Sequence, residues 1–452
     1  MILGYKPLSK MFTPGRESGA AIIFFAFIIG LAMTSYVLYG ISSQRLKANN
    51  DHATREALKQ AKAALIAFSA QDLSPGICTT NCPRPGDLPC PDTDNDGLSN
   101  ACSSQALRLG RLPWKTLGIE DLRDASSERL WYAVSTNYKN NPRIRPLNSD
   151  TPGTITLRSS TGAIVNDGGD STGVVAIVFA PGSPLVREDG VAQMRDSSNQ
   201  NIPINYLDVA FGEDNANFVD GNANGFITGP ITGSNNQEIL NDQIVSITKN
   251  DMVAMMESRV LAETTNALLD YYCGSGNANY SLKVCMNFAG NRFFPNAALF
   301  NDTTCLGYTA NLGSCLPNVA SNARGRVPAN PSPDWNSTSI LRSIVNGNWF
   351  QQNGWRELIY YAVAPACLAS TPDCSGSGFL TLNNSLTTPV NSKRFVVIAT
   401  GQALNAQSRV SNVNKSAEFN YLEGENITPL DNIYTRSSPL TLSINDRAAS
   451  LP

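Results

Sequence analysis

The residues of this chain best suited to chemistry are three aspartates at alternate positions. Asp92, Asp94 and Asp96 lie in "PDTDNDGLSN", with Gly97 at the position where a calcium-binding loop bends and Asn100 three residues beyond it. Carboxylates this close together repel one another unless a cation joins them. The spacing therefore predicts a Ca²⁺ site formed by the three aspartates, the side chain of Asn100 and a backbone carbonyl.

Cysteines bracket this acidic segment. Cys90 and Cys102 are placed to staple the loop with a disulfide. Ser103 occupies the twelfth loop position, where the calcium loop of an EF-hand has a bidentate glutamate. The segment is thus either a short, disulfide-flanked calcium loop or an acidic turn, and the residues leave both interpretations open.

Catalytic chemistry has little support in the sequence. His52 is the only histidine and lies in the amphipathic part of the N-terminal helix, so a catalytic Ser-His or Cys-His pair is effectively absent. There is no glycine-rich phosphate loop, and sequence spacing does not reveal a carboxylate pair for glycoside hydrolysis. We predict that the protein is not an enzyme and has no catalytic residues.

The cysteine pattern indicates an oxidising compartment. All ten cysteines follow the apolar N-terminal segment, and no CxxC spacing is present to suggest zinc. We predict disulfides, with pairing between sequence neighbours as the simplest arrangement. The candidates are Cys78, Cys82, Cys90, Cys102, Cys273, Cys285, Cys305, Cys315, Cys367 and Cys374.

An uncharged segment near the N-terminus predicts a membrane-spanning helix. The apolar run from Ala20 to Ile41 has about the 20 residues that span a bilayer, and no cleavage site of a secretory signal follows it. Helical spacing continues to about residue 72. Lys6, Lys10 and Arg16 precede the run and favour a cytoplasmic N-terminus. We therefore expect a single-pass protein of the bacterial inner membrane.

This N-terminal pattern resembles the type IV pilin and pseudopilin family. Members have a basic leader ending in glycine, an apolar helix with an amphipathic continuation, and a globular head. The resemblance implies that a prepilin peptidase cuts between Gly19 and Ala20 and that the new N-terminus is methylated. Most members have a glutamate at the fifth mature position, where this chain has Phe24. The tip pseudopilin also lacks it, and calcium sites occur in major pseudopilins.

Six short segments of the chain recur in the same order, which predicts an internal repeat. The matched pairs are 63–69 with 266–272, 110–113 with 325–328, 128–134 with 357–363, 154–157 with 379–382, 176–185 with 395–404, and 217–222 with 420–425. Several of these segments are rich in β-branched and aromatic residues, as strands are. Each half therefore reads as a helix followed by strands, and the second helix is expected to begin near Asp251.

These patterns predict an α+β fold: a long N-terminal transmembrane and amphipathic helix, then two tandem pilin-like heads, each a helix packed on an antiparallel sheet. We expect a leader over residues 1–19, the helix over 20–72 with its transmembrane part at 20–41, a first head over 73–240 and a second over 241–452. The aromatic pairs Trp131–Tyr132 and Tyr360–Tyr361 should pack between helix and sheet.

The resemblance implies a structural function. We expect a minor pilin or pseudopilin at or near the tip of a type IV pilus or type II secretion pseudopilus, presenting its heads for adhesion, priming or substrate contact. Its partners would be other subunits through the N-terminal helix, the prepilin peptidase and the inner membrane before assembly. The alternative is an uncleaved, membrane-anchored periplasmic protein that binds a secreted substrate, a glycan or DNA.

Charge adds little to the choice of partner. Charged residues make up only 16% of the chain and the formal net charge is −3, so no overall basic field draws it to nucleic acid. A locally basic segment runs from Gln105 to Pro146. DNA or a host surface therefore stays a candidate partner that no motif supports.

Overall fold

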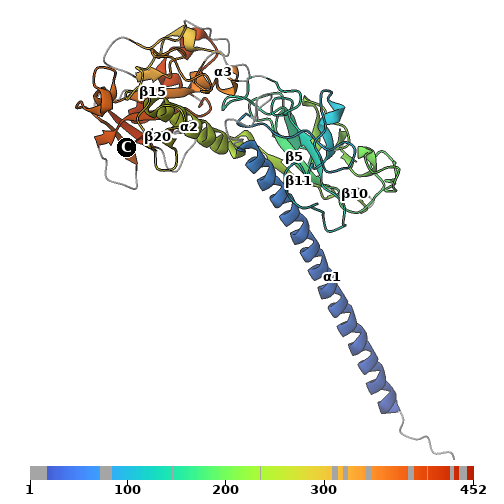
Figure 1. Ribbon diagram of the computed structural model, residues 1–452. Helices are drawn as coiled ribbons and strands as arrows, with labels where there is room; N and C mark the ends of the chain where they lie inside the picture. The colour runs from blue at the N-terminus through green and yellow to red at the C-terminus, as the bar shows by residue number, and fades with distance from the viewer. Residues whose placement is uncertain are drawn as a thin grey trace, which may run out of the picture. The chain divides into compact units, whose positions relative to one another are not determined.

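A computed structural model describes most of the chain (Figure 1). The described residues are 18–71, 84–144, 146–234, 236–307, 314–318, 324–342, 348–384, 391–404, 406–427, 432–436 and 445–451. Between residues 18 and 44 only the side chains of Ile29 and Met33 are described. The chain divides into two compact units, Met1–Glu56 and Ala57–Pro452.

The first unit contains the start of helix α1 (Ser18–Ser69). Within the described residues, no helix is both long enough and apolar enough to cross a bilayer. The expected transmembrane helix over residues 20–41, and with it the single-pass inner-membrane location, is therefore not supported and is corrected here. Residues 1–17 of the expected leader, with the basic residues that suggested the orientation, lie outside the described residues, and Ser18 and Gly19 begin α1.

The last turns of α1 belong to the second unit. Ala57, Leu58, Ala61 and Leu65 are buried there, at the helical spacing that the sequence showed. They join a core that also contains Tyr132 and Val178 of the first half's sheet. Hydrophobic burial along one helical face thus holds this part of α1 in place.

Four antiparallel strands form the main sheet of the first half. They are β1 (Leu109–Arg111), β2 (Trp131–Val134), β5 (Ala176–Ala180) and β11 (Gln243–Ile247), in the order β1-β2-β5-β11. The last strand, β11, immediately precedes helix α2 (Lys249–Cys273). Thr248 caps α2: its hydroxyl accepts from the Asp251 amide while the Asp251 carboxylate accepts from the Thr248 amide.

The second half contains a four-stranded antiparallel sheet of the same connectivity. Its strands are β14 (Arg324–Arg326), β15 (Ile359–Val363), β18 (Phe395–Ala399) and β20 (Arg447–Leu451), in the order β14-β15-β18-β20. Helix α2 contacts β18 and β20 (Figure 1). The segments that the sequence matched at 110–113, 128–134 and 176–185 contribute β1, β2 and β5, and their counterparts contribute β14, β15 and β18.

Each half also has a three-stranded sheet with one parallel pair. In the first half β3 (Ile155–Arg158) lies between β4 (Ile164–Asn166) and β8 (Gly221–Ile227), and β3 and β8 are parallel. In the second half β16 (Leu380–Asn384) lies between β17 (Asn391–Lys393) and β19 (Ile433–Arg436), and β16 and β19 are parallel.

The remaining described elements are short. The two-stranded sheets pair β6 (Val209–Ala210) with β7 (Glu213–Asp214), β9 (Ile231–Thr232) with β10 (Glu238–Leu240), and β12 (Ala278–Asn279) with β13 (Val284–Cys285). The short α-helices are α3 (Trp349–Gln352), α4 (Trp355–Leu358) and α5 (Asn412–Lys415). The 3-10 helices are η1 (Ala106–Arg108), η2 (Pro203–Asn205), η3 (Thr303–Cys305), η4 (Pro365–Cys367), η5 (Pro372–Cys374), η6 (Glu418–Asn420) and η7 (Gly424–Ile427).

The expected fold class is therefore wrong. The described chain consists mainly of short strands in seven small sheets with few helices, and it includes no long apolar helix. A helix packed on a single antiparallel sheet does not describe either half, because parallel-paired sheets are also present.

Burial on both faces of the main sheet explains part of this difference. Tyr132 and Val178 belong to the core shared with the helices, whereas Trp131 and Phe179 belong to a second core with Leu157 of β3. The expectation that Trp131 packs between helix and sheet is wrong, since it faces the second core. A strand buried on both faces has a continuous apolar sequence and does not alternate, so its sequence does not show what covers each face.

Candidate functional site

The acidic loop is held between a disulfide and strand β1. Cys90 and Cys102 are disulfide-bonded, with their Cα atoms 5.7 Å apart. Asp92 pairs with Arg111 through two backbone hydrogen bonds, 3.0 Å from its own amide to the Arg111 carbonyl and 2.7 Å in return. The loop is therefore anchored at its base and free to present the side chains beyond Asp92.

The carboxylate of Asp92 organises the loop from inside. Its Oδ1 accepts from the amides of Asp94 at 3.2 Å and Asn95 at 2.6 Å, and its Oδ2 accepts from the amide of Gly97 at 2.7 Å. Asp92 is only 1% exposed, and its burial raises the pKa of the carboxyl above the ordinary value. Gly97 has φ +87°, and a Cβ there would lie 2.7 Å from the Trp114 ring, so glycine is needed at this bend.

The other predicted ligands lie beside this carboxylate. One oxygen from each of Asp92, Asp94 and Asp96 lies within 4.8 Å of the others, and Asp94 and Asp96 are exposed. The Asn100 amide donates to Asp94 at 3.2 Å, and its oxygen accepts from the Thr93 amide at 2.7 Å. The structure thus brings the three aspartates together as a set of oxygen donors, the chemistry that Ca²⁺ prefers, whereas Asn100 presents its amide nitrogen to Asp94 and its oxygen to Thr93.

Basic residues near this loop contact its backbone. Lys115 donates to the carbonyl of Asp96, and Arg129 donates to the carbonyl of Asn95 at 3.1 Å and to its side-chain oxygen at 2.6 Å. No ion pair between these cations and the three aspartates is recorded among the described residues. The negative charge of the loop therefore stays available to a cation.

In the described part of the second half, the segment equivalent to this loop has one aspartate, Asp302, and no cluster of carboxylates. Ala298 pairs with Arg326 of β14 in the way that Asp92 pairs with Arg111 of β1. Its successors are Leu299 and Phe300, and Phe300 packs under the Arg326 guanidinium at 4.1 Å from the ring centre. Among the described residues, the oxygen cluster thus occurs in the first half alone.

Sequence reasoning missed a buried polar network in the first half. The Asp208 carboxylate accepts from the amide of Asn241 at 2.7 Å and from the side chain of Gln193 at 2.8 Å. Asp242 accepts from the Asp208 amide and from the Asn215 side chain, both at 2.8 Å. The bonds to Asn241 and Asp242 join loops to the residues before β11, and the bond from Gln193 to Asp208 joins two loops, so the network fixes the loops against the sheet.

The same network recurs in the second half. The Glu423 carboxylate accepts from the amide of Asn445 at 3.0 Å and from the side chain of Gln407 at 2.8 Å. Asp446 accepts from the Glu423 amide at 3.1 Å and from the Asn426 side chain at 2.9 Å. These equivalences align residues 205–208 with 420–423. The sequence match of 217–222 with 420–425 is therefore wrong.

The two carboxyl pairs have perturbed acidities. Burial raises the pKa of Asp208 to about 6, and burial together with the charge of Asp208 raises the pKa of Asp242 well above its ordinary value. In the second half burial raises the pKa of Glu423, and burial with the charge of Glu423 raises that of Asp446. Because backbone amides and Asn or Gln side chains of the same fold occupy all of these carboxyl oxygens except Asp242 Oδ1 and Asp446 Oδ1, we assign the pairs to structure. The repeated "NYLD" and "NYLE" are the sequence signal that could have revealed them.

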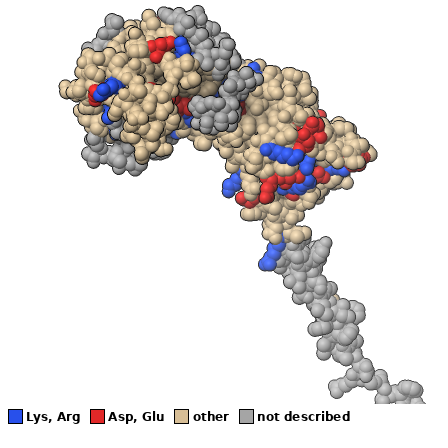
Figure 2. Space-filling model, in the orientation of Figure 1, with Lys and Arg blue, Asp and Glu red and all other residues tan. Residues whose placement is uncertain are grey.

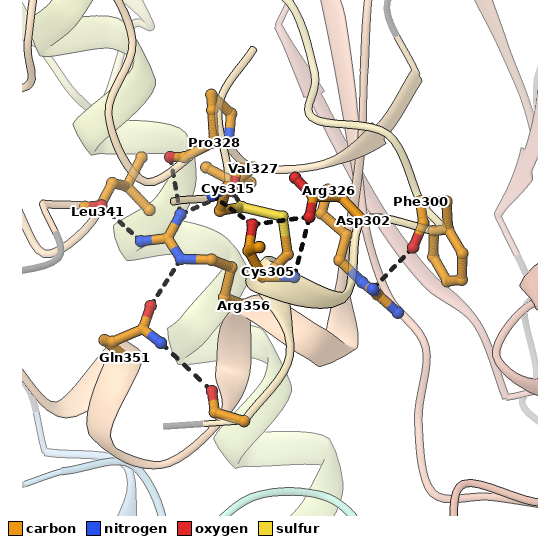
Figure 3. Close-up of a disulfide and its surroundings, with 12 residues drawn as sticks. Phe300, Asp302, Cys305, Cys315, Arg326, Val327, Pro328, Leu341, Gln351 and Arg356 are labelled. Carbon is orange, nitrogen blue, oxygen red and sulfur yellow. Dashed lines mark hydrogen bonds between the residues drawn. A yellow bond between two sulfur atoms is a disulfide. The ribbon is translucent and has the colours of Figure 1, made fainter. Parts of the chain in front are cut away.

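A buried arginine without a carboxylate partner lies beside a disulfide in the second half (Figure 3). The Arg356 guanidinium donates to the carbonyls of Val327 and Pro328 at 2.7 Å and Leu341 at 2.6 Å, and to the Gln351 side chain at 2.7 Å. Burial lowers the pKa of Arg356 to about 9. Its contacts join the described parts of the loops around the Cys305–Cys315 disulfide.

The prediction of disulfides is confirmed for the described cysteines. The pairs are Cys90–Cys102, Cys273–Cys285, Cys305–Cys315 and Cys367–Cys374. Cys78 and Cys82 lie outside the described residues. Gly19 and Ala20 lie in the first turn of α1 by their backbone, and their side chains are outside the description, so processing at this bond stays a prediction.

The basic segment of the first half is partly internal. Arg108, Arg111 and Lys139 are buried, and Arg108 pairs with Asp220 at 2.5 Å. On the face drawn in Figure 2, acidic and basic side chains lie side by side and most of the surface is uncharged. That face therefore offers no continuous basic surface for phosphates.

No family model matches this chain, and neither the curated proteins nor the solved structures contain a significant match. The function is therefore inferred from the fold and from the residues of the candidate site.

Proposed function

We propose that this protein is a structural subunit of a pilin-like filament, a minor pilin or pseudopilin of a type IV pilus or type II secretion pseudopilus. It contacts neighbouring subunits through α1 and presents its two halves for adhesion, priming or substrate contact. The proposal describes an assembly protein and assigns it no catalysis.

Exposed apolar side chains on α1 carry this proposal. Ile29 is 49% exposed, Met33 67% and Leu46 64%. Ile29 and Met33 are four residues apart, so they lie on one face of the helix. Water is a poor environment for such a face, and burial against a helix of another subunit would remove it from solvent.

The duplicated fold supports a display function. Both halves have the same main-sheet order and the same buried polar network, so each is an equivalent scaffold. The halves differ at their loops, where the first has the acidic loop and the second has the Arg356 cradle. Rigid scaffolds with divergent loops are typical of proteins that present binding surfaces.

A place at the filament end follows from Phe24, where pilins of the shaft have glutamate. That glutamate pairs with the buried amino terminus of the next subunit, and an unpaired charge among apolar helices is costly. A subunit without this glutamate has no carboxylate to pair with the amino terminus of a neighbouring subunit. Such a subunit suits a position with a neighbour on one side.

The experiment that tests the proposal is site-specific cross-linking from α1 in the native host. A photo-reactive amino acid at Met33 should capture the apolar N-terminal helix of another pilin-like subunit, identified by mass spectrometry of the linked peptides. The same probe at Asn49, an exposed polar position on α1, is the control and should capture much less. Equal capture at both positions, or no linked helix at Met33, would overturn the proposal.

We also propose that the acidic loop binds Ca²⁺. The observation in favour is the convergence of three carboxylate oxygens and the Asn100 amide at one loop. The ion would lie between the carboxylates of Asp94 and Asp96, with the outward lone pairs of Asp92 completing the carboxylate set, and Asn100 would join through its side-chain oxygen after releasing Thr93. In this arrangement the metal would stiffen the loop that the first half presents.

A further inference from the structure

A cavity of about 390 Å³ lies beside α2, between this helix, the β12–β13 hairpin and β20. Its lining includes Ser258, Thr265 and Asn266 from α2, Lys283 from the hairpin and Arg436 from the end of β19. This volume is in the range of pockets that hold small ligands. None of the residues discussed for the acidic loop or for Arg356 lines it.

Among the described residues, the charged side chains that line this cavity are both cations. Lys283 and Arg436 line it, and their charges are close enough that burial, Arg436 and then Lys393 lower the pKa of Lys283. In the part of the chain that the structure describes, no carboxylate forms an ion pair with Lys283, Lys393 or Arg436. Tyr280, which also lines the cavity, donates to Asp270 at 2.9 Å, so that carboxylate is already engaged.

The first half shows how the equivalent position is neutralised. Ser246 of β11 and Ser450 of β20 hold the same register position, next to Ile247 and Leu451. Lys62 donates to the Ser246 carbonyl at 3.0 Å and pairs with Asp251 at 2.9 Å. Lys283 donates to the Ser450 carbonyl at 3.4 Å and has no ion pair with a carboxylate among the described residues. In the described part of the second half the cation is thus repeated and the counter-charge is not.

A buried hydroxyl in the same cavity also lacks a partner. By the match of residues 63–69 with 266–272, Thr265 occupies the position of Lys62. Thr265 is 2% exposed, lines the cavity, and its Oγ1 has no hydrogen-bond partner. A buried polar atom left unpaired is destabilising unless a ligand or water satisfies it. The Thr265 hydroxyl is therefore an unpaired polar group at the wall of the cavity.

We propose that this cavity binds an anionic sugar, whose carboxylate or phosphate lies between Lys283 and Arg436 and whose hydroxyls bond Thr265, Asn266 and Ser258. Two uncompensated cations select the negative charge. Neutral hydroxyl and amide groups match a polyhydroxylated ring, and Leu261, Ala448 and Ala449 provide an apolar surface for its C–H groups. The inference concerns the second half alone and does not depend on filament assembly.

The test is isothermal titration calorimetry on the full chain with four probes: glucuronate, glucose 6-phosphate, glucose and sulfate. Saturable binding of glucuronate or of glucose 6-phosphate is expected, and the preferred one identifies the anion as carboxylate or phosphate. Lys283→Gln and Arg436→Gln should each weaken binding about tenfold, as expected for the loss of a charge-assisted hydrogen bond. Thr265→Val should weaken it less, and circular dichroism shows whether each variant folds.

Lys47→Gln, an exposed cation on α1, is the matched control and should leave binding unchanged. Failure of both anionic sugars to bind at millimolar concentration overturns the proposal. So does sulfate binding as tightly as the sugars, because the site would then recognise charge alone. Binding that survives both cation variants places the ligand elsewhere and has the same consequence.

Discussion

Glu257 provides the sharpest test of the electrostatics of this fold. It lies on α2 and is fully buried, its Oε1 accepts from the Ser149 hydroxyl at 2.7 Å, and its Oε2 lies 2.9 Å from the Arg447 Nε without hydrogen-bond alignment. Burial raises the pKa of this carboxyl from 4.5 to about 7, against the lowering effects of Ser149 and Arg447. The folded protein therefore keeps a proton that the unfolded chain releases.

The size of the effect follows from this difference. From 4.5 to about 7 is about 2.5 pH units, and one unit corresponds to 1.36 kcal/mol, so the full effect is about 3 kcal/mol. Between these two values the native state binds more protons than the unfolded state. The free energy of unfolding should thus fall as the pH rises through this window, and the loss should be complete above about pH 7.

Urea denaturation of the full chain with its disulfides intact, from pH 4 to pH 8, measures this term. Glu257→Gln keeps the shape of the side chain and removes its titration. The free energy of unfolding of the wild type minus that of the variant should therefore fall by about 3 kcal/mol across the window, because the contributions of other buried carboxyls are the same in both proteins. Ser149→Ala removes a bond to the charged form and should extend the fall to higher pH. A difference that is flat with pH, or that rises, would refute the reasoning.

Three further predictions concern metal, processing and packing. Chelation of Ca²⁺ should lower the melting temperature of the wild type and should not change that of Asp94→Ala. Asp302→Asn, which changes a loop aspartate of the second half, is the control and should respond to chelation as the wild type does. The absence of any calorimetric signal on adding Ca²⁺ would contradict the site. Mass spectrometry of the protein from its native host should show a mature chain beginning at Ala20, and an intact Met1 in cells with an active prepilin peptidase would contradict processing. Arg356→Met leaves four hydrogen-bond acceptors without their donor and should lower the free energy of unfolding in urea by at least about 3 kcal/mol. Arg342→Met, which removes a partly exposed ion pair, is the control and should lower it by less than about 1 kcal/mol. Similar losses for the two variants would show that the buried contacts of Arg356 contribute little to stability.

Local chemistry accounts for the features that could be predicted. The Cys90–Cys102 and Cys273–Cys285 disulfides close short loops, so sequence proximity was a sufficient guide. The cap of α2 is formed within four residues, from Thr248 to Asp251. The aspartates at 92, 94 and 96 converge because a single turn contains them. Each of these depends on contacts between residues close in sequence.

Long-range contacts account for what was missed. The parallel pairing of β3 with β8 joins strands more than 60 residues apart, and the sequence of neither strand identifies the other as its partner. The transmembrane expectation depended on hydropathy alone. The buried pairs around Asp242 and Asp446 join loops to distant strands, and an isolated aspartate in sequence looks the same whether it is exposed or buried.

The sequence by itself indicated the repeat that contributes corresponding strands to the main sheet of each half, the presence of disulfides and the composition of the acidic loop, because these depend on local spacing and on repetition along the chain. Only the tertiary structure decided which faces of the sheets are covered, which buried carboxyls have a raised pKa, and that Lys283 and Arg436 line one cavity with no ion pair to a described carboxylate. The physical reason is that burial and electrostatic environment are properties of neighbours in space. Lys62 and Lys283 are both lysines in the sequence, and only the fold gives one an aspartate and leaves the other a cavity.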